Sequence, residues 1–223
     1  TGGPDVWAGS GGRPEFTIHR PAAYDDVRLT DEDVAKLAAW DPGWLYYGTL
    51  SSMAESSRAL LARLAEAVPG ARRFYDINLR KDSYTPGLVA ELASRANAVK
   101  MNHEEMAGLC GMFGLPGAGI EEFCRAGAQR FGWQAAAVTL GERGCAIWVN
   151  GDYAEAAGVA VKVADTVGAG DAFAAGFVHG LSLGWPPQEI GQFANRLGAL
   201  IATRPGGTPE WSIDEVPSLG AEN

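Results

Sequence analysis

The sequence predicts an α/β fold in which a mostly parallel central sheet lies between two layers of helices. Apolar runs of strand length alternate with segments of helical spacing along most of the chain, and this alternation is typical of such sheets. The dipeptide Asn150-Gly151 lies between two short apolar runs and indicates an antiparallel hairpin toward one edge. Because no internal repeat and no long linker follows residue 13, we expect residues 14–223 to form a single domain.

The elements expected in the first half of the chain each have a local signal. Residues 1–12 contain five glycines and one proline, which predicts a glycine-rich loop. Thr30 precedes three acidic residues and is typical of a helix N-cap. Residues 44–49 are an apolar run, which predicts a strand covered on both faces. The expected elements are a strand at 14–20, a helix at 31–40, a strand at 44–49, a helix at 52–68 and a strand at 73–80 that turns polar at its carboxyl end.

The second half continues the alternation. Thr85-Pro86 indicates the start of a helix, because proline is favoured in a first helical turn. The residues after Gly170 are apolar or small nearly all round, so we expect a helix buried on most sides. The expected elements are a helix at 86–95, a strand at 98–102, helices at 104–113 and 120–131, a strand at 135–141, hairpin strands at 145–149 and 153–156, the helix after Gly170 and a helix at 187–203.

Composition excludes several classes of function. A formal net charge of −9 and a pI of about 4.8 argue against binding to nucleic acid or to an anionic membrane surface, because both need a basic patch. The three cysteines are scattered, so neither a disulfide framework nor a metal cluster is expected. The longest apolar run is far shorter than the roughly 20 residues that span a bilayer, and nothing resembles a signal peptide. We therefore expect a soluble, cytoplasmic protein with reduced thiols.

The segment D-T-V-G-A-G-D-A-F at residues 165–173 combines a flexible turn, free amides and a carboxylate. Gly168 to Gly170 would form the turn that enters the following helix, with amides that have no partner inside it. Such a turn favours an anion, because the positive end of the helix dipole lies there as well. Asp171 would then accept a proton from a nucleophile that attacks a bound phosphate. The structural alternative is that Asp171 only caps the helix.

Polar residues follow three of the predicted strands, at the edge of the sheet where ligands of open parallel sheets bind. They are Asp76, Asn78 and Arg80, then Asn102 and Glu105, then Thr139 and Gly141. Because Asp76, Asn78 and Arg80 alternate along the predicted strand, we expect their side chains to point to one face. With the turn before Asp171, four loops would meet at one edge, which favours a functional site. Each loop has a structural alternative: a buried hydrogen-bonded network for the first, a helix cap for the second and a hairpin turn for the third. The segment His103-Glu104-Glu105 does not match the H-E-x-x-H zinc pattern, so no histidine is assigned to a metal.

These motifs together resemble the ribokinase-like carbohydrate kinases of the phosphofructokinase B type. Residues 165–173 are similar to the second family signature, D-T-x-G-A-G-D-x-F, and the supporting motifs occur in the same order as in the family. They are D-I-N-L-R at 76–80, K-M-N-H-E-E at 100–105, T-L-G-E-R-G at 139–144 and T-R-P-G-G at 203–207. The resemblance covers residues 14 to about 210 and implies a ribokinase-like three-layer α/β/α sandwich with a mostly parallel central sheet.

The resemblance also implies an activity, the transfer of the γ-phosphate of ATP to a sugar hydroxyl. Asp171 would be the catalytic base, and the amides of Gly168, Ala169 and Gly170 would form the anion hole. The sugar would contact Asp171 together with two residues of the D-I-N-L-R motif, Asp76 and Asn78. Partners would thus be two small molecules, ATP and a sugar. Many relatives dimerise through lid strands, so a homodimer is among the states that the resemblance allows.

Further residues would bind the nucleotide and its ions. By resemblance, Asn102 and Glu105 would position Mg²⁺ through water and phosphate, and Arg80 would supply positive charge near the phosphates. The residues implied for the nucleotide pocket are Thr139, Gly141 and Gly144. A monovalent cation, K⁺, is bound by many relatives beside the anion hole. The residues implied for it, mostly through backbone oxygens, are Asp165, Val167, Ile201, Arg204 and Gly206.

The family pattern departs from this sequence at its beginning. The first family signature, a glycine-rich segment that binds the sugar, and an early Asp have no counterpart here, so the N-terminal strands and the lid are expected to be incomplete. Residues 1–13 correspond to a loop or a remnant of the lid, and we expect the complete protein to contain the preceding part. Fructokinase is the most similar member, followed by 2-keto-3-deoxygluconate kinase and ribokinase. A non-catalytic sugar or nucleotide sensor is the alternative, while a dinucleotide-dependent oxidoreductase is disfavoured because no G-x-G-x-x-G motif follows a strand.

Overall fold

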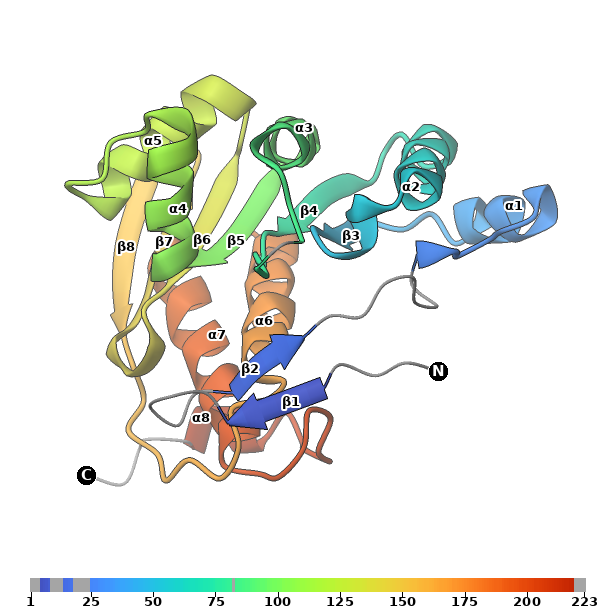
Figure 1. The fold of residues 1–223 in the computed structure, drawn as a ribbon. Helices are drawn as coiled ribbons and strands as arrows, with labels where there is room; N and C mark the ends of the chain where they lie inside the picture. Colours follow the sequence, from blue (N-terminus) through green and yellow to red (C-terminus); the bar gives the residue numbers. More distant parts are fainter. Residues whose placement is uncertain (1–4, 9–13, 18–24, 82, 219–223) are drawn as a thin grey trace.

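A six-stranded sheet forms the centre of the molecule in the computed structural model, which describes residues 5–8, 14–17, 25–81 and 83–218 (Figure 1). The strands follow one another in chain order across the sheet. They are β3 (Trp44–Gly48), β4 (Arg72–Asp76), β5 (Ala98–Asn102), β6 (Ala135–Thr139), β7 (Gly144–Val149) and β8 (Asp152–Ala157). The first four are parallel, whereas β7 is antiparallel to both of its neighbours. The predicted mostly parallel sheet with a hairpin at one edge is therefore confirmed.

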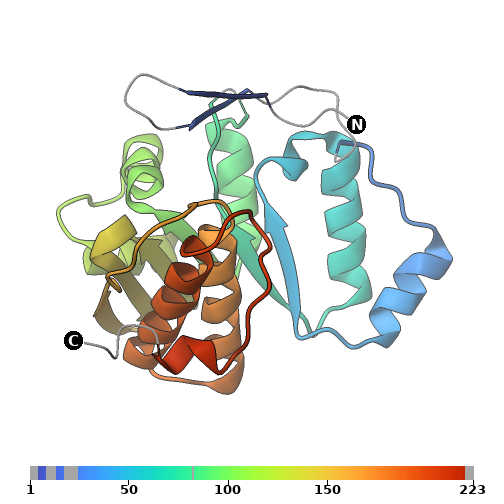
Figure 2. The same cartoon turned by 90° about the horizontal axis from the view of Figure 1, so that it is seen from below.

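Helices cover both faces of the sheet (Figures 1 and 2). One layer consists of α2 (Glu55–Ala67), α3 (Pro86–Arg95), α4 (His103–Phe113) and α5 (Ile120–Phe131), with α1 (Asp31–Ala39) against α2. The other layer consists of α6 (Ala169–Leu183) and α7 (Pro187–Ala202), with the short α8 (Glu215–Ser218) beside α7. The three-layer α/β/α arrangement that the sequence predicts is confirmed. None of the helices in the described part of the chain is long and apolar enough to cross a membrane.

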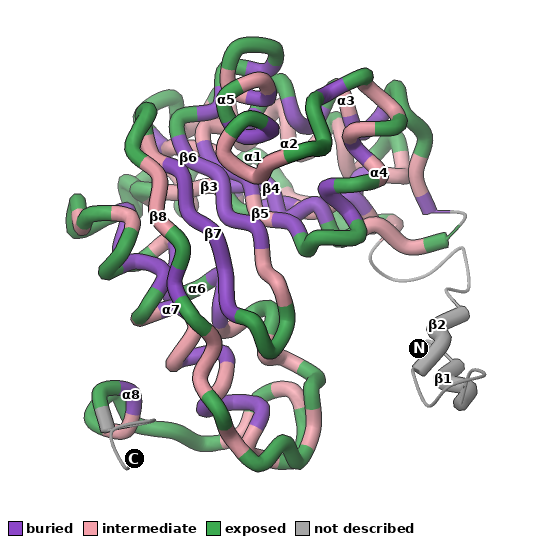
Figure 3. Tube along the Cα trace, turned by 90° about the vertical axis from the view of Figure 1, so that its left-hand side faces the viewer, coloured by how far each residue is buried: buried purple, intermediate pink, exposed green. Residues whose placement is uncertain are grey.

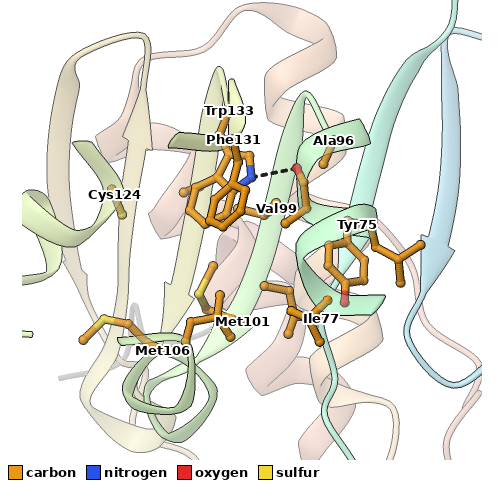
Figure 4. Close-up of a cluster of buried hydrophobic side chains, with 14 of the residues drawn as sticks. Tyr75, Ile77, Ala96, Val99, Met101, Met106, Cys124, Phe131 and Trp133 are labelled. Atoms are coloured by element: carbon orange, nitrogen blue, oxygen red, sulfur yellow. Dashed lines mark hydrogen bonds between the residues drawn. The ribbon is translucent and has the colours of Figure 1, made fainter. Parts of the chain in front are cut away.

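The two layers bury separate apolar cores, because successive residues of a strand point to opposite faces. On β4, Phe74 packs toward α6, whereas Tyr75 packs toward α3. The central strands are accordingly the most buried part of the trace (Figure 3). In the core under α3, α4 and α5, the Trp133 ring stacks on Phe131 and its Nε1 donates to the Ala93 carbonyl at 3.1 Å (Figure 4). Both faces of the middle strands are thus closed to water, which fixes the register of the sheet.

Local signals place most element ends where the sequence predicts them. Thr30 forms the capping box of α1, and Thr85 caps α3 with proline at its first position. Asn102 and Glu105 form the capping box of α4. Asn150, with φ of 50°, leads into the turn between β7 and β8 as expected for a hairpin of the Asn-Gly type.

Four expectations were wrong in detail. The sequence predicted a loop at residues 1–12, but Asp5–Ala8 forms strand β1, which pairs with β2 (Pro14–Thr17) in a separate antiparallel sheet. Residues 18–20 of the strand predicted at 14–20 lie outside the described residues. Strand β3 is at the edge of the six-stranded sheet, so it is not covered on both faces, and Tyr46 is 56% exposed. Helix α2 begins after a short 3-10 turn, Ser51–Met53. Helix α6 buries one side only and exposes residues such as His179 on the other.

Candidate active site

The loops predicted to meet do so at the carboxyl ends of the parallel strands, together with the N-terminus of α6. Gly168 is the N-cap of α6 and adopts φ of 83°, a left-handed conformation that favours glycine. A Cβ atom on Gly168 would lie 2.1 Å from the carbonyl oxygen of Gly207, so the two loops touch through their backbones. A larger residue could not occupy position 168 without moving this turn.

The first turn of α6 presents free amides. The Ala169 amide donates to the Thr166 carbonyl at 3.3 Å, and the Ala172 amide donates to the Gly168 carbonyl at 2.9 Å. Among the described residues, no acceptor is bonded to the amides of Gly170 and Asp171. These amides and the positive end of the dipole of a 15-residue helix favour an anion at this turn.

Asp171 is the third residue of α6 and therefore not its N-cap, which excludes the simple capping alternative. Its side chain is exposed, and no described residue forms a hydrogen bond or an ion pair with it. The charge of Asp171 nevertheless acts on groups near the end of β4. Burial, followed by the charges of Asp76 and Asp171, raises the pKa of Tyr46, and the charge of Asp171 also raises the pKa of Asp76. An exposed carboxylate of this kind, beside amides that have no acceptor among the described residues, can accept a proton from a hydroxyl group.

A buried ion pair lies across from Asp171. Lys100 Nζ is 3.0 and 3.1 Å from the two carboxylate oxygens of Asp76, and the two side chains are only 11% and 2% exposed. These residues are register partners on the adjacent parallel strands β4 and β5. Tyr46 adds a longer hydrogen bond, from its hydroxyl to Asp76 Oδ2 at 3.3 Å. Burial raises the pKa of the Asp76 carboxyl, and the positive charge of Lys100 opposes that rise.

Lys100 was not among the candidate residues that the sequence indicated, although one signal was present. A lysine in the third position of the otherwise mostly apolar strand A-V-K-M-N needs a partner, because a buried charge is costly unless it is paired. The structure places its ammonium group beside the α6 turn as well. A Cβ atom built on Gly170 would lie 3.6 Å from Lys100 Nζ. Lys100 therefore brings a positive charge between the end of β4 and the start of α6.

Asp76, Asn78 and Arg80 do not share one face, so this expectation from the sequence was wrong. Strand β4 ends at Asp76, and Asn78 has φ of 39°, which breaks the alternation of side chains. Asn78 is exposed and Arg80 is half-buried, whereas Asp76 is buried. A hollow of about 270 Å³ opens beside them, between the ends of β3 and β4. Its lining residues are Tyr46, Gly48, Thr49, Leu50, Ser51, Asp76 and Asn78.

The Glu105 carboxylate joins three segments at the same edge. It accepts the Asn102 amide at 2.8 Å and the Leu79 amide at 2.9 Å, while Asn102 Oδ1 accepts the Glu105 amide at 2.8 Å. Burial raises the pKa of Glu105, although these amides and the charge of Lys100 oppose the rise. Both Glu105 oxygens already accept one amide each. Carboxylate and amide oxygens held in this way fit Mg²⁺ that is bound through water, since Mg²⁺ usually keeps several waters.

A third loop, between β6 and β7, turns tightly at the same edge. Thr139 ends β6, and a 3-10 turn, Gly141–Arg143, leads into β7. Gly141 has φ of 64° and Gly144 has φ of 106°. A Cβ atom on Gly144 would lie 2.0 Å from the carbonyl oxygen of Ala156. Glycine at these two positions allows the tight turn between antiparallel strands, and residues 141–143 of the turn are exposed.

Asp165 ties the segment before α6 to the segment after α7. Its Oδ1 accepts the Val167 amide at 3.0 Å, and its Oδ2 accepts the Gly206 amide at 3.1 Å. The Arg204 amide donates to the Ile201 carbonyl at 3.0 Å, and the Arg204 guanidinium binds Glu215. Four of the five residues implied for a monovalent cation therefore lie in two loops joined by hydrogen bonds, and the fifth, Ile201, lies in the last turn of α7. Carbonyl oxygens of such loops are suitable ligands for a hard cation.

Comparison with known proteins connects this site to a family. The model of the pfkB family carbohydrate kinase matches residues 8–213. The chain belongs to this family. A fructokinase from Klebsiella pneumoniae is 31% identical over 211 residues, which are 88% of this chain and 66% of that protein. This pfkB family chain thus spans about two thirds of the length of that relative.

Solved structures of other proteins share the fold of this pfkB family chain. A 2-dehydro-3-deoxygluconokinase from Thermotoga maritima superimposes with a TM-score of 0.78 at 18% identity, over 97% of this chain and 71% of that one. A fructokinase from Vibrio cholerae, solved with fructose, ADP and calcium ion bound, has a TM-score of 0.66 at 26% identity. That match covers 79% of this chain and 60% of the other. The ribokinase-like fold predicted from the sequence is confirmed.

Proposed function

We propose that the complete protein is an ATP-dependent sugar kinase in which Asp171 is the catalytic base. One observation carries the proposal: an exposed carboxylate without a described partner lies in the first turn of α6, beside amides without a described acceptor. The attacking sugar hydroxyl would give its proton to Asp171 as its oxygen bonds to the γ-phosphorus of ATP. The bond from phosphorus to the β,γ-bridging oxygen breaks, and ADP leaves.

The remaining candidate residues surround this reaction centre. The amides of Gly168, Ala169 and Gly170 are assigned to the anion hole, where Gly170 offers an amide without a described acceptor and Ala169 offers one that is already shared with Thr166. Asp76 and Asn78 line the hollow between the ends of β3 and β4 and are assigned to the sugar.

Residues of the neighbouring loops are assigned to the nucleotide and its ions. Asn102 and Glu105 would hold Mg²⁺ through water, and Mg²⁺ would neutralise charge on the phosphates when bound. Arg80 is assigned to the phosphates, and the nucleotide pocket is assigned to Thr139, Gly141 and Gly144. The K⁺ site is assigned to the backbone of the two loops joined through Asp165 and of the last turn of α7, with Val167, Ile201, Arg204 and Gly206 as its other members.

Fructose is the sugar that we propose first. The support is the 31% identity to the Klebsiella pneumoniae fructokinase and the D-I-N-L-R motif at residues 76–80. 2-Keto-3-deoxygluconate and ribose are the next candidates. A panel of these three sugars with ATP and Mg²⁺, assayed for ADP release on the complete protein, ranks them by kcat/KM.

Asp171→Asn tests the mechanism. We expect the variant to fold and to bind ATP as the wild type does, and to lose sugar-dependent ADP release by at least about 100-fold, because the general base is removed. Wild-type turnover by Asp171→Asn would refute the assignment. A wild-type protein that binds sugar or nucleotide in calorimetry and phosphorylates no sugar would instead establish the sensor alternative.

A further inference from the structure

We propose that Lys100 is the cation that binds the transferring phosphoryl group, and that Asp76 positions it. The inference rests on the proposed kinase function and adds a catalytic residue to it. The site needs such a cation, because the chain carries a net charge of −9 and Asp76, Glu105 and Asp171 all lie at the same edge of the sheet. A phosphate group would be repelled from this edge without a positive charge close by.

Lys100 is held where it is by rigid elements. It lies on β5, which pairs with β4 on one side and with β6 on the other, and its ammonium group contacts both oxygens of Asp76. Asp76 is the last residue of β4 and almost fully buried. A charge fixed in this way needs no reorganisation during a reaction, which is the property that makes electrostatic stabilisation of a transition state effective.

The ammonium group also has an open direction. It carries three hydrogens, and Asp76 is its one hydrogen-bonding partner among the described residues. Nζ lies close to the first turn of α6, since a Cβ atom on Gly170 would be only 3.6 Å away. An oxyanion bound in the proposed anion hole, where Gly170 offers its amide, would therefore lie next to Lys100. The same group would receive amide hydrogen bonds from one side and a positive charge from the other.

A purely structural role for the ion pair makes a different prediction. A buried pair that only holds β4 to β5 would affect the free energy of unfolding, and removal of one partner would be costly because it leaves the other charge buried and unpaired. Replacement of both charges avoids that cost. The informative variant is thus Lys100→Met combined with Asp76→Asn, compared with Asp76→Asn alone, because the two proteins differ only at position 100, where Met is also unbranched but carries no ammonium group.

The experiment measures chemistry and binding on the complete protein. For wild type, Asp76→Asn, the double variant and the surface control Lys36→Met, we would determine kcat and KM with sugar and ATP, and the affinity of the Mg²⁺–ADP–sugar complex for fluoroaluminate, a mimic of the transferring phosphoryl group. Lys36 is exposed and pairs only with Glu32 on α1 among the described residues, so its variant should match the wild type. Urea denaturation confirms that each variant is folded.

We expect the double variant to have a kcat about 100-fold below that of Asp76→Asn, and a similarly weakened affinity for fluoroaluminate, with little further change in the KM for sugar. A folded double variant whose kcat and fluoroaluminate affinity equal those of Asp76→Asn would overturn the role of Lys100 while leaving the kinase function intact. A wild-type protein without turnover on any sugar would overturn both. The first two outcomes require an active wild type, so the two failures are distinguishable.

Discussion

The two glycines at the ends of helix α6 provide a matched test of the geometry at the candidate anion site. Gly168 is the N-cap with φ of 83°, and Gly184 is the C-cap with φ of 70°. Both need a left-handed backbone, but they differ in their surroundings. A Cβ atom on Gly168 would lie 2.1 Å from the Gly207 carbonyl oxygen, whereas a Cβ atom on Gly184 would meet no heavy atom within 4 Å. Alanine at each position therefore separates backbone strain from the collision.

The expected losses of stability follow from the backbone strain and the collision. Gly184→Ala should lower the free energy of unfolding by about 1–2 kcal/mol, the cost of a left-handed conformation for a residue with a Cβ atom. Gly168→Ala should add about 1–3 kcal/mol for overpacking against backbone that cannot rotate away, giving a total loss of about 2–5 kcal/mol. Because the turn must move, its amides leave their positions, and a displacement of about 1 Å can reduce a reaction rate about 100-fold.

Urea denaturation followed by tryptophan fluorescence measures the first effect, and sugar-dependent ADP release measures the second. We expect Gly184→Ala to keep wild-type kcat and Gly168→Ala to lose it by about 100-fold. Equal losses of stability in the two variants would show that the contact with Gly207 is not tight. Wild-type kcat in Gly168→Ala would show that this turn does not take part in the reaction.

Two further predictions concern packing and pH. Gly127→Ala should lower the free energy of unfolding by about 1–3 kcal/mol, because its Cβ atom would lie 2.1 Å from the Trp133 ring, and an unchanged denaturation midpoint would contradict this packing. Hydrogen bonds from the Val167 and Gly206 amides lower the pKa of Asp165, so its stabilising effect is present above the unfolded pKa and is lost as the pH falls through the lower folded pKa. The difference in unfolding free energy between wild type and Asp165→Asn should thus be constant down to about pH 4 and shrink below it. A difference that grows on acidification would show that the ionised Asp165 carboxylate does not stabilise the two loops.

The parts of the fold that sequence could predict depend on short stretches of chain. Helix caps such as Thr30 and Thr85, and the hairpin at Asn150, are determined by residues within a few positions of each other. The glycine turn that begins α6 was predictable for the same reason, because Gly168, Gly170 and Asp171 are all contained in nine consecutive residues.

Other features depend on distant residues and were not predictable. The ion pair of Lys100 with Asp76 joins residues 24 positions apart, and it exists only because β4 and β5 pair in a register that places them side by side. The shared face expected for residues 76–80 failed because β4 ends at Asp76 and Asn78 takes a positive φ, which polar composition alone does not reveal. The exposure of Tyr46 follows from the edge position of β3, which is a property of strand order rather than of local sequence.

The turn of the antiparallel hairpin formed by β7 and β8 is an attachment point that lies away from the candidate active site. The candidate site lies at the carboxyl ends of the parallel strands. Strand β7 runs away from these ends and β8 runs back toward them, so the turn at Asn150-Gly151 lies at the opposite ends of the strands. Both turn residues are exposed, and exposed turn tips tolerate insertions well. A fluorophore, an affinity tag or an immobilisation linker placed there would report on the protein, or tether it to a surface, from the end of the sheet that binds no substrate in the proposed reaction.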